Sequence, residues 1–443
     1  TMEHAPTEQD LLVRGGRVID PDSGRDELAD VLVRDGLVEA IAPGLDGSPG
    51  VEVIEAEGCL VTPGLIDPHV HLREPGGESK ETIATGSRAA VAGGFTTVCC
   101  MPNTVPAIDS VRTLEFVHQR AEHGALCRVY AVAAATIGRR GEEIAPIDSL
   151  VRAGAVGISD DGDVVADPLM MQQVLATCAR HDTVFMQHAQ EPSLTVGASM
   201  NAGATCTRLG LRGWPRIAEE LVVERDLRIL AETGGRYHVQ HVSSGGTVEL
   251  IRRARARGLQ ASGEASPHHL LLDDRACEGY DTMAKMNPPL REEADIHALR
   301  QGVADGTIGI LATDHAPHTL QEKSLDFESA PFGIVGLECA LGLYAKALVE
   351  PGLIDWPRLV ALMTIEPARL VGLDASGIGT LAPGGPADLT IIDPGHCWTV
   401  RTGEFAGKGR NCPFEGWTLT GRAITTIVDG VPVHAVEAPS GVG

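Results

Sequence analysis

Hydrophobic and polar positions at the start of the chain alternate in short runs that are typical of β-strands. The runs are Leu11–Asp20, Asp30–Ile41 and Val51–Val61, and Gly-Gly, Pro-Asp and Asp-Gly pairs mark turns among them. The pattern predicts a small all-β layer.

After Pro63-Gly64 the pattern changes, and short apolar runs alternate with longer amphipathic segments, as in strand–helix units around a parallel sheet. The apolar runs are Leu65–Leu72, Phe95–Met101, Arg128–Thr136, Ala155–Asp160, Thr183–His188, Tyr237–Val242, Leu259–Ala265 and Ile308–Thr313. The helical patterns include Glu78–Ala92, Val111–His123, Asp167–Arg180, Ala218–Glu232, Thr247–Arg257 and Ala294–Ala304. Eight such units predict a closed (β/α)8 barrel.

Two further helical stretches, Gly336–Val349 and Trp356–Val371, precede a segment rich in Gly and Pro at 381–386. β-type runs then return at Asp388–Ile392, Trp398–Val400 and Ala423–Val436. We therefore expect an α/β protein in which a TIM barrel spans residues 63–379. We expect residues 1–62 and 380–443 to form together a small β-sandwich domain. Length alone would also allow three domains.

Composition narrows the function classes. The chain has 443 residues, of which 43% are hydrophobic and 22% charged, so it is expected to be globular. A formal net charge of −24 without a run of four basic residues argues against nucleic-acid and anionic-membrane partners. The ten cysteines form no C-x-x-C pair and predict reduced thiols. Residues 1–10 are polar and no long apolar stretch occurs, which favours a soluble, cytoplasmic protein.

Candidate metal ligands follow the predicted strands, where the loops of a barrel converge on one rim. His69 and His71 are two positions apart on a strand and so point to the same side. The alternative is a pair of ordinary strand histidines, but further donors end other strands, namely Asp160, Asp161, His188, His241 and Asp314. Burying these charged and polar side chains without a metal would cost free energy, because they would lose their hydration without gaining a partner. Histidine and carboxylate donors without thiolates suit Zn(II), Mn(II) or Co(II), and their number fits two ions.

The order of these motifs resembles that of the amidohydrolase superfamily, and of bacterial type I dihydroorotases in particular. The resemblance rests on residues 64–76 (GLIDPHVHLREPG), 101–104 (MPNT), 159–162 (SDDG), 287–291 (NPPLR) and 312–318 (ATDHAPH). It covers nearly the whole chain, from Leu11 to Gly430.

The resemblance implies a role for each matching residue. His69, His71 and Asp314 would hold one ion and His188 and His241 the other. Asp161 would bridge the two ions, with Asp160 as the weaker candidate. The substrate contacts would be His71, Arg73, Asn103, Asn287 and His318, with backbone groups of Phe332 and Gly333 closing over the ring.

The implied activity is the reversible cyclisation of N-carbamoyl-L-aspartate to L-dihydroorotate in de novo pyrimidine (UMP) biosynthesis. In ring opening, a hydroxide that bridges two divalent ions, by expectation Zn(II), would attack the ring carbonyl. Asp314 would act as general acid and base, moving the proton to the leaving nitrogen. Arg73 offers the bidentate fork that a substrate carboxylate requires.

Two alternatives to dihydroorotase activity are open. Hydantoinase, dihydropyrimidinase and allantoinase relatives place a carboxylated lysine at the end of strand four, and Ile158–Asp161 contains no lysine. An inactive scaffold for aspartate transcarbamoylase would lack several ligands, and here every position is filled. The family also implies a homodimer and possible association with aspartate transcarbamoylase.

Several nearby residues are given structural roles. His268 and His269 are expected to support the site by hydrogen bonding, and His315 to pack beside Asp314. Cys99 and Cys100 are expected to be buried thiols. After the fifth-strand histidine the chain has His188-Ala189-Gln190-Glu191, where many relatives have Cys-Glu-Asp. The segment Thr319–Gly333 is long enough to move as a lid.

Overall fold

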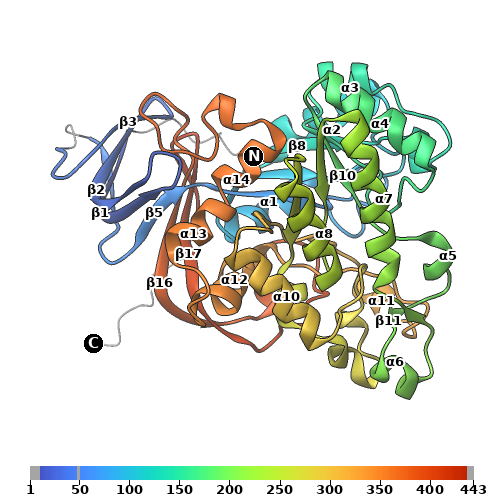
Figure 1. Ribbon diagram of the computed structural model, residues 1–443. Helices are drawn as coiled ribbons and strands as arrows, with labels where there is room; N and C mark the ends of the chain where they lie inside the picture. The colour runs from blue at the N-terminus through green and yellow to red at the C-terminus, as the bar shows by residue number, and fades with distance from the viewer. Residues whose placement is uncertain (1–9, 47–49, 437–443) are drawn as a thin grey trace.

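A computed structural model describes residues 10–46 and 50–436 of the chain. The ends of the predicted β-sandwich, residues 1–9 and 437–443, and the short stretch 47–49 lie outside the described residues. Figure 1 shows a sheet built from both ends of the chain, on the left, beside a larger unit of alternating strands and helices.

The larger unit is a parallel sheet of eight strands, and all eight predicted runs contribute one strand. In spatial order the strands are β6 (Leu65–Val70), β7 (Phe95–Cys100), β8 (Arg128–Ala133), β9 (Gly157–Ile158), β10 (Val184–Gln187), β13 (Arg236–Val239), β14 (Ala261–Ala265) and β15 (Ile310–Leu311). A parallel bridge between Val70 and His315 joins the first strand to the segment after the last, and His71 N donates to His315 O at 2.9 Å. The predicted TIM-barrel fold class is confirmed.

Helices follow the barrel strands and pack outside them (Figure 1). They are α1 (Ile83–Ala92), α2 (Val111–Gly124), α3 (Ile147–Arg152), α4 (Pro168–Arg180), α7 (Ile217–Thr233), α8 (Gly245–Ala256), α9 (Pro267–Leu271) and α10 (Glu293–Ala304). The helix predicted from Glu78 starts later than expected, because Thr82 caps it at Ile83. Glu78 and Glu81 instead accept hydrogen bonds from the backbone N–H groups of Gly76 and Lys408.

Smaller elements complete the loops of the barrel. These are α5 (Pro192–Thr195), β11 (Met200–Asn201), α6 (Ala204–Leu209), β12 (Gly213–Trp214), α11 (Leu320–Lys323), α12 (Ala340–Tyr344), α13 (Trp356–Leu362) and α14 (Ile365–Val371). The 3-10 helices are η1 (Ile137–Arg139), η2 (Asp274–Tyr280), η3 (Thr282–Ala284), η4 (Leu337–Cys339), η6 (Asp374–Ser376) and η7 (Thr402–Glu404), and η5 (Ala345–Val349) is a π-helix. The sequence pattern did not predict α5, α6, β11 or β12, which are too short to show a period.

The two ends of the chain form one sheet, as expected. Its strands are β1 (Leu11–Asp20), β2 (Arg25–Arg34), β3 (Leu37–Ala42), β4 (Glu52–Glu55), β5 (Leu60–Pro63), β16 (Leu389–Thr399), β17 (Thr418–Val428) and β18 (Val431–Ala435). They follow the order β18-β17-β16-β5-β1-β2-β3, with β4 beside β1, and the antiparallel pair β5 and β16 joins the two segments. The domain boundaries at 62/63 and 379/380 stay a prediction.

Two predicted runs of this sheet are hairpins in the structure. Asp35-Gly36 separates β2 from β3, and Asp429-Gly430 separates β17 from β18. All four residues have positive φ, which is the conformation of a tight hairpin turn. The continuous runs expected at Asp30–Ile41 and Ala423–Val436 are therefore wrong in this detail.

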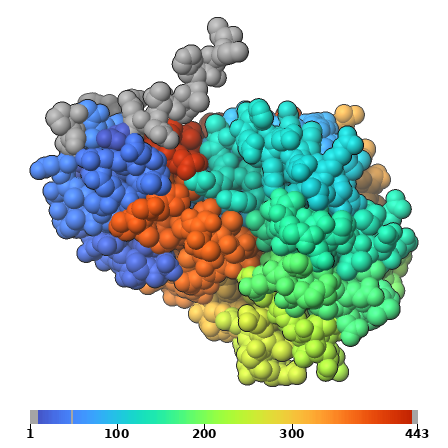
Figure 2. All heavy atoms as spheres, turned by 90° about the horizontal axis from the view of Figure 1, so that it is seen from above, coloured from blue at the N-terminus to red at the C-terminus, as the bar shows by residue number. Residues whose placement is uncertain are grey.

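The outer surface shows how the parts meet. Figure 2 shows the N-terminal strands (blue) next to a segment in orange that lies between them and the barrel (green and teal). By residue number the orange segment includes α13 and α14, which follow the barrel. Within residues 10–46 and 50–436, no helix has the length and apolar character needed to cross a membrane.

Candidate metal centre

One cavity lies at the ends of the barrel strands and gathers nearly all the predicted site residues. Its volume is about 310 Å³. Its lining includes His71, Arg73, Asn103, Asp161, His188, His241, Asn287, Asp314, His318, Phe332 and Gly333. His69, which is fully buried, lies beneath it within 3.5 Å of Asp161 and Asp314. Residues far apart in sequence therefore meet at one rim, as the barrel topology requires.

Three donors form the first group. Nε2 of His71 lies 2.8 Å from Oδ1 of Asp314, and Nε2 of His69 lies 3.5 Å from the same oxygen. One ligand atom from each of these three residues lies within 4.8 Å of the other two, close enough for all three to hold one ion. Asp67, in the middle of β6, accepts hydrogen bonds from the backbone N–H groups of His69 and Thr313. It thereby ties the strand that carries the histidines to the one that precedes Asp314.

Asp161 lies at the centre of the second group. Its Oδ1 is 3.4 Å from Nδ1 of His188, 3.6 Å from Nε2 of His241 and 3.4 Å from Nε2 of His69. Its Oδ2 is 3.5 Å from Nε2 of His71. Asp161 therefore contacts all four histidines, which is the position expected of a bridging ligand.

Asp160 is oriented away from this cluster. Its carboxylate accepts hydrogen bonds from the backbone N–H groups of Ala135 and Thr136 and from the Thr136 hydroxyl. Since its oxygens are engaged in the neighbouring loop, the geometry favours Asp161 over Asp160 as the bridge.

The electrostatics of the cluster reflect closely spaced donors. Burial alone would lower the pKa of His69. The negative charges of Asp161, Glu264 and Asp314 have the larger effect and raise this pKa well above its ordinary value. Burial would raise the pKa of Asp314, but His69 and His71 lower it to about 2. His69 and His71 also both lie within 3.5 Å of Asp161, so the charges of these residues influence one another.

The donor set fits a divalent cation. Both Asp161 oxygens, His69 Nε2 and His241 Nδ1 are buried and accept or donate no hydrogen bond within the described part of the chain. Buried polar atoms normally have partners, so these atoms are available to bind a cation. The donors are imidazoles and carboxylates without a thiolate, a set that suits Zn(II) or Mn(II).

A buried carboxylate that the sequence reading missed supports the ligands. Oε1 of Glu264 lies 2.6 Å from Nδ1 of His69 and accepts the backbone N–H of His241 at 3.0 Å. Its Oε2 lies 3.0 Å from Nε2 of His238, whose Nδ1 contacts Ser262 at 2.8 Å. A carboxylate on the second nitrogen fixes the tautomer of a metal-binding histidine. The available signal was a glutamate within the otherwise apolar or small run Ala261–Ala265.

The predicted substrate contacts line the same cavity as the candidate metal donors. Arg73 Nε donates to the carbonyl of Pro317 at 3.2 Å, and a terminal nitrogen lies 3.4 Å from Nε2 of His318. Burial lowers the pKa of Arg73 to about 10, so its guanidinium stays charged at neutral pH. Asn103 Oδ1 lies 2.9 Å from Nδ1 of His71.

Two further polar residues, to which the sequence analysis gave no role, contact residues that line the cavity. Gln190, from the departure after His188, contacts His188 Nε2 at 3.1 Å and accepts a hydrogen bond from Asn287 Nδ2 at 3.1 Å. It therefore links a predicted metal ligand to a predicted substrate contact. Lys80 lies 3.3 Å from Nδ1 of His318 and forms an ion pair with Glu322.

The residues given structural roles are buried. His269 Nε2 donates to the carbonyl of Pro288 at 2.9 Å, and burial lowers the pKa of His268 to about 4. His315 Nδ1 accepts the backbone N–H of Gly336 at 3.2 Å. Cys99 and Cys100 are buried free thiols whose pKa burial raises, as expected of thiols in an apolar interior.

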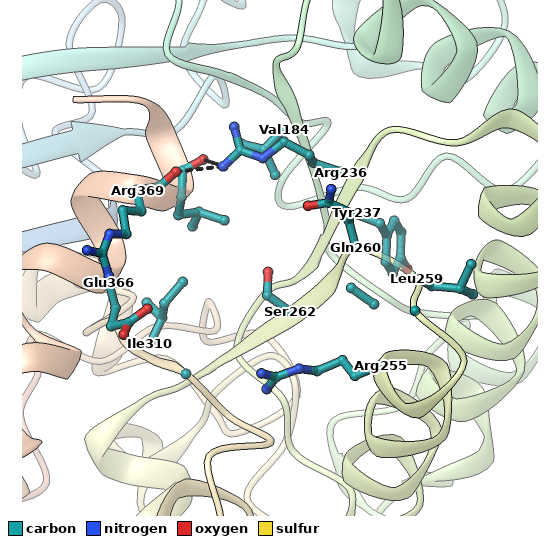
Figure 3. A pocket seen from close by; sticks show the side chains of 14 residues that line it. Val184, Arg236, Tyr237, Arg255, Leu259, Gln260, Ser262, Ile310, Glu366 and Arg369 are labelled. Carbon is teal, nitrogen blue, oxygen red and sulfur yellow. Dashed lines mark hydrogen bonds between the residues drawn. The ribbon is translucent and has the colours of Figure 1, made fainter. Parts of the chain in front are cut away.

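A second cavity lies at the opposite end of the barrel strands and is lined by different residues. Its volume is about 430 Å³, and Figure 3 shows Ser262 near its centre, between Arg255 and Glu366. Arg236 donates to the carbonyls of Arg369 and Leu370, drawn as dashed lines. Its lining contains none of the predicted site residues, so the chemistry is expected at the other end.

Comparisons with known proteins show which family the chain resembles. A family described as Dihydro-orotase-like matches residues 58–247. The chain is 46% identical over 424 residues to a dihydroorotase of Pelobacter propionicus, covering 96% of this chain and 99% of the relative. It is 47% identical over 420 residues to a dihydroorotase of Pelotomaculum thermopropionicum, covering 95% and 97%.

Solved structures extend the likeness to a wider group. An L-hydantoinase (dihydropyrimidinase) from Arthrobacter aurescens superposes with a TM-score of 0.86 at 26% identity, over 96% of each chain. A dihydropyrimidinase from Brevibacillus agri has a TM-score of 0.85 at 24% identity, over 98% of this chain and 96% of the other, and shows the fold alone.

Proposed function

Because the chain belongs to the dihydroorotase family of metal-dependent cyclic amidohydrolases, we propose that it interconverts N-carbamoyl-L-aspartate and L-dihydroorotate in pyrimidine biosynthesis. Its dihydroorotase activity rests on similarity over nearly its full length. The observation that carries the substrate assignment is the position of Arg73, which lines the same cavity as the histidines and carboxylates of the candidate metal centre.

We propose a centre of two divalent ions, with Zn(II) as the expected metal. His69, His71 and Asp314 would hold one ion, His188 and His241 the other, and Asp161 both. When bound, such ions supply Lewis acidity towards the ring carbonyl and lower the pKa of a water nucleophile.

Arg73 binds and orients the substrate. L-Dihydroorotate carries a carboxylate next to its cyclic amide, and a guanidinium can hold both carboxylate oxygens at once. Asn103 and Asn287 offer amide groups from other sides of the cavity, and His318 lies against Arg73. Contacts from several directions would hold the substrate ring in one orientation, with its carbonyl facing the candidate metal centre. Fixing the reacting groups in this orientation lowers the entropic part of the reaction barrier.

Asp314 moves the proton. Its low pKa keeps it ionised at neutral pH, so an oxygen of its carboxylate can accept the proton of the attacking water. The water oxygen bonds to the ring carbonyl carbon, the bond from that carbon to the ring nitrogen breaks, and Asp314 returns the proton to this nitrogen. Ring closure follows the same path in reverse.

A comparison of substrates tests the proposal. L-Dihydroorotate, hydantoin and dihydrouracil are offered side by side to the metal-loaded chain, and hydrolysis of each is followed by absorbance. We expect dihydroorotate to be much the best substrate, because only it presents a carboxylate to Arg73. Faster turnover of hydantoin or dihydrouracil would assign the chain to another cyclic amidohydrolase activity.

Metal analysis addresses the scaffold alternative. We expect about two divalent ions per chain, and a stoichiometry near zero with intact binding to aspartate transcarbamoylase would favour an inactive scaffold. The homodimer, its association with aspartate transcarbamoylase and the cytoplasmic location stay predictions, and sedimentation of the chain alone and mixed with the transcarbamoylase would test the first two.

A further inference from the structure

Two buried lysines hold the segment that forms one wall of the cavity. This segment runs from Lys323, at the end of α11, to Gly333, and its residues Pro331, Phe332 and Gly333 line the cavity. From Ser324 onwards it contains no helix or strand, so the hydrogen bonds of its backbone must come from elsewhere.

Lys285 supplies three of these hydrogen bonds. Its side chain is fully buried, and Nζ donates to the carbonyls of Phe327 at 2.6 Å, Glu328 at 3.0 Å and Ala330 at 2.6 Å. An ammonium group has three N–H donors and no acceptor, so this arrangement uses all of them. Nζ also lies 4.5 Å from the centre of the Phe332 ring, within range of a cation–π interaction.

Lys323 completes the set from the other side. Its Nζ donates to the carbonyls of Pro331 at 3.0 Å and Gly333 at 3.1 Å, and more distantly to that of Lys285 at 3.5 Å. The backbone N–H of Gly333 donates to the same Lys285 carbonyl at 2.9 Å. The two lysines are therefore linked to each other as well as to the segment, and we refer to Lys285 and Lys323 as the lysine clamp.

Burying two lysine ammonium groups costs free energy, because both lose their hydration. A buried ammonium normally has a carboxylate partner, and neither lysine forms an ion pair within residues 10–46 and 50–436. Burial lowers the pKa of both, that of Lys323 to about 7. The chain has only five lysines, and two of them occupy these positions. Their use here calls for a reason beyond filling space.

The position of Gly333 provides the reason. Its φ is +147°, and a Cβ there would lie 2.7 Å from the carbonyl oxygen of Ala316 and 2.7 Å from Cδ2 of His318. Buried Asn411 donates to the carbonyls of Gly333 at 3.0 Å and Ala316 at 2.9 Å, and accepts the backbone N–H of His318 at 3.0 Å. A shift of Gly333 would therefore displace His318 as well.

We propose that Lys285 and Lys323 are positioning residues for the substrate, which hold residues 327–333 as a fixed wall that places Phe332, Gly333 and His318 against it. The inference rests on the proposed function, because it takes this cavity as the site of dihydroorotate. Within the described residues, Nζ of neither lysine forms a hydrogen bond or ion pair with a donor of the candidate metal centre. The clamp therefore governs substrate affinity more than metal binding or proton transfer.

Lys285→Met and Lys323→Met test the inference, each measured as the metal-loaded full chain with L-dihydroorotate. We expect KM to rise about tenfold or more, kcat to change less than about threefold, and metal content to stay the same. Amide hydrogen exchange of the peptide covering 324–335 should become faster. Lys346→Met is the matched control, because it makes the same chemical change at a partly exposed lysine that pairs with Glu350. It should change none of these quantities.

Three outcomes would overturn the inference: unchanged exchange in 324–335, faster exchange with an unchanged KM, or an equal fall of kcat and metal content. If neither methionine variant folds, Thr282→Val is the milder test. It removes a hydroxyl that donates to the Lys323 carbonyl, and we expect smaller changes in the same directions. A wild-type chain that does not process dihydroorotate would refute the proposed function instead, whereas the exchange rates still report on the clamp.

Discussion

Glu264→Gln is the most direct test of how the barrel interior supports the metal centre. The substitution keeps the size of the side chain and removes its charge. Burial would raise the pKa of Glu264, but His69 and His238 outweigh burial and lower it, so the carboxylate is ionised at neutral pH. It contacts the ring of His69 at 2.6 Å and the backbone N–H of His241 at 3.0 Å.

The expected magnitude follows from the loss of charge in these hydrogen bonds. A bond to a charged acceptor contributes about 1.5–3 kcal/mol and a neutral one about 0.5–1.5 kcal/mol. The substitution should therefore weaken the hydrogen bond between residue 264 and Nδ1 of His69 by about 1–1.5 kcal/mol. If this loss is passed on to the metal, its affinity falls about tenfold. His238 can change tautomer and donate to Ser262, so its own bond to the new amide is retained.

A competition titration against a chelator measures the affinity, with metal content determined separately. Asp226→Asn is the matched control, because Asp226 is equally buried and its carboxylate binds Gln187, Tyr237 and Arg225, none of them a predicted ligand. Unchanged metal affinity in Glu264→Gln, or an equal loss in both variants, would refute the reasoning.

Four other predictions follow from the geometry. Arg73→Lys should raise KM for dihydroorotate about 30-fold or more, measured by steady-state kinetics, because an ammonium cannot bind both carboxylate oxygens. Gly333→Ala should also raise KM, since its Cβ would meet the His318 ring, and an unchanged KM would show that this loop has room. Removing the metal with a chelator should abolish turnover and lower Tm, and added Zn(II) should restore both. Burial raises the pKa of Asp226 to about 6 from an ordinary 3.8, so its protonated form stabilises the fold at low pH and this contribution is lost as pH rises through 6. The Tm of Asp226→Asn relative to wild type should therefore rise between pH 5 and 7.5, by the equivalent of about 1 kcal/mol.

The barrel could be predicted from sequence because its strands are buried on both faces and its helices on one. The resulting change from continuous apolar runs to a helical period located all eight strands. Strands β9 and β15 have only two residues each in the structure, yet their apolar runs were still visible. The hairpin at Asp429-Gly430 was missed because the apolar positions continue on either side of the turn.

The candidate metal donors could be proposed from the sequence because each lies near or just after the end of a strand, and strand ends of a barrel meet at one rim. The supporting residues could not be found in the same way. Glu264 lies within a strand, Lys285 lies in a loop, and Lys323 ends the four-residue helix α11, which is too short to show a period. What defines them is burial together with a partner from a distant segment, and neither property can be read from a local run of residues. A charged residue inside an apolar strand was the one available signal.

Backbone strain connects the donors to their support. Three predicted site residues have positive φ, namely Arg73 at 61°, His241 at 30° and Asp314 at 49°. Such conformations cost side-chain-bearing residues about 1–3 kcal/mol each and persist only where the surroundings impose them. Glu264 accepts the backbone N–H of His241, and Asp67 accepts that of Thr313, just before Asp314. The same buried carboxylates thus orient predicted ligands and hold the strained backbone next to them, so we expect the geometry of the candidate metal centre to depend on Glu264 and Asp67 as well as on the donors themselves.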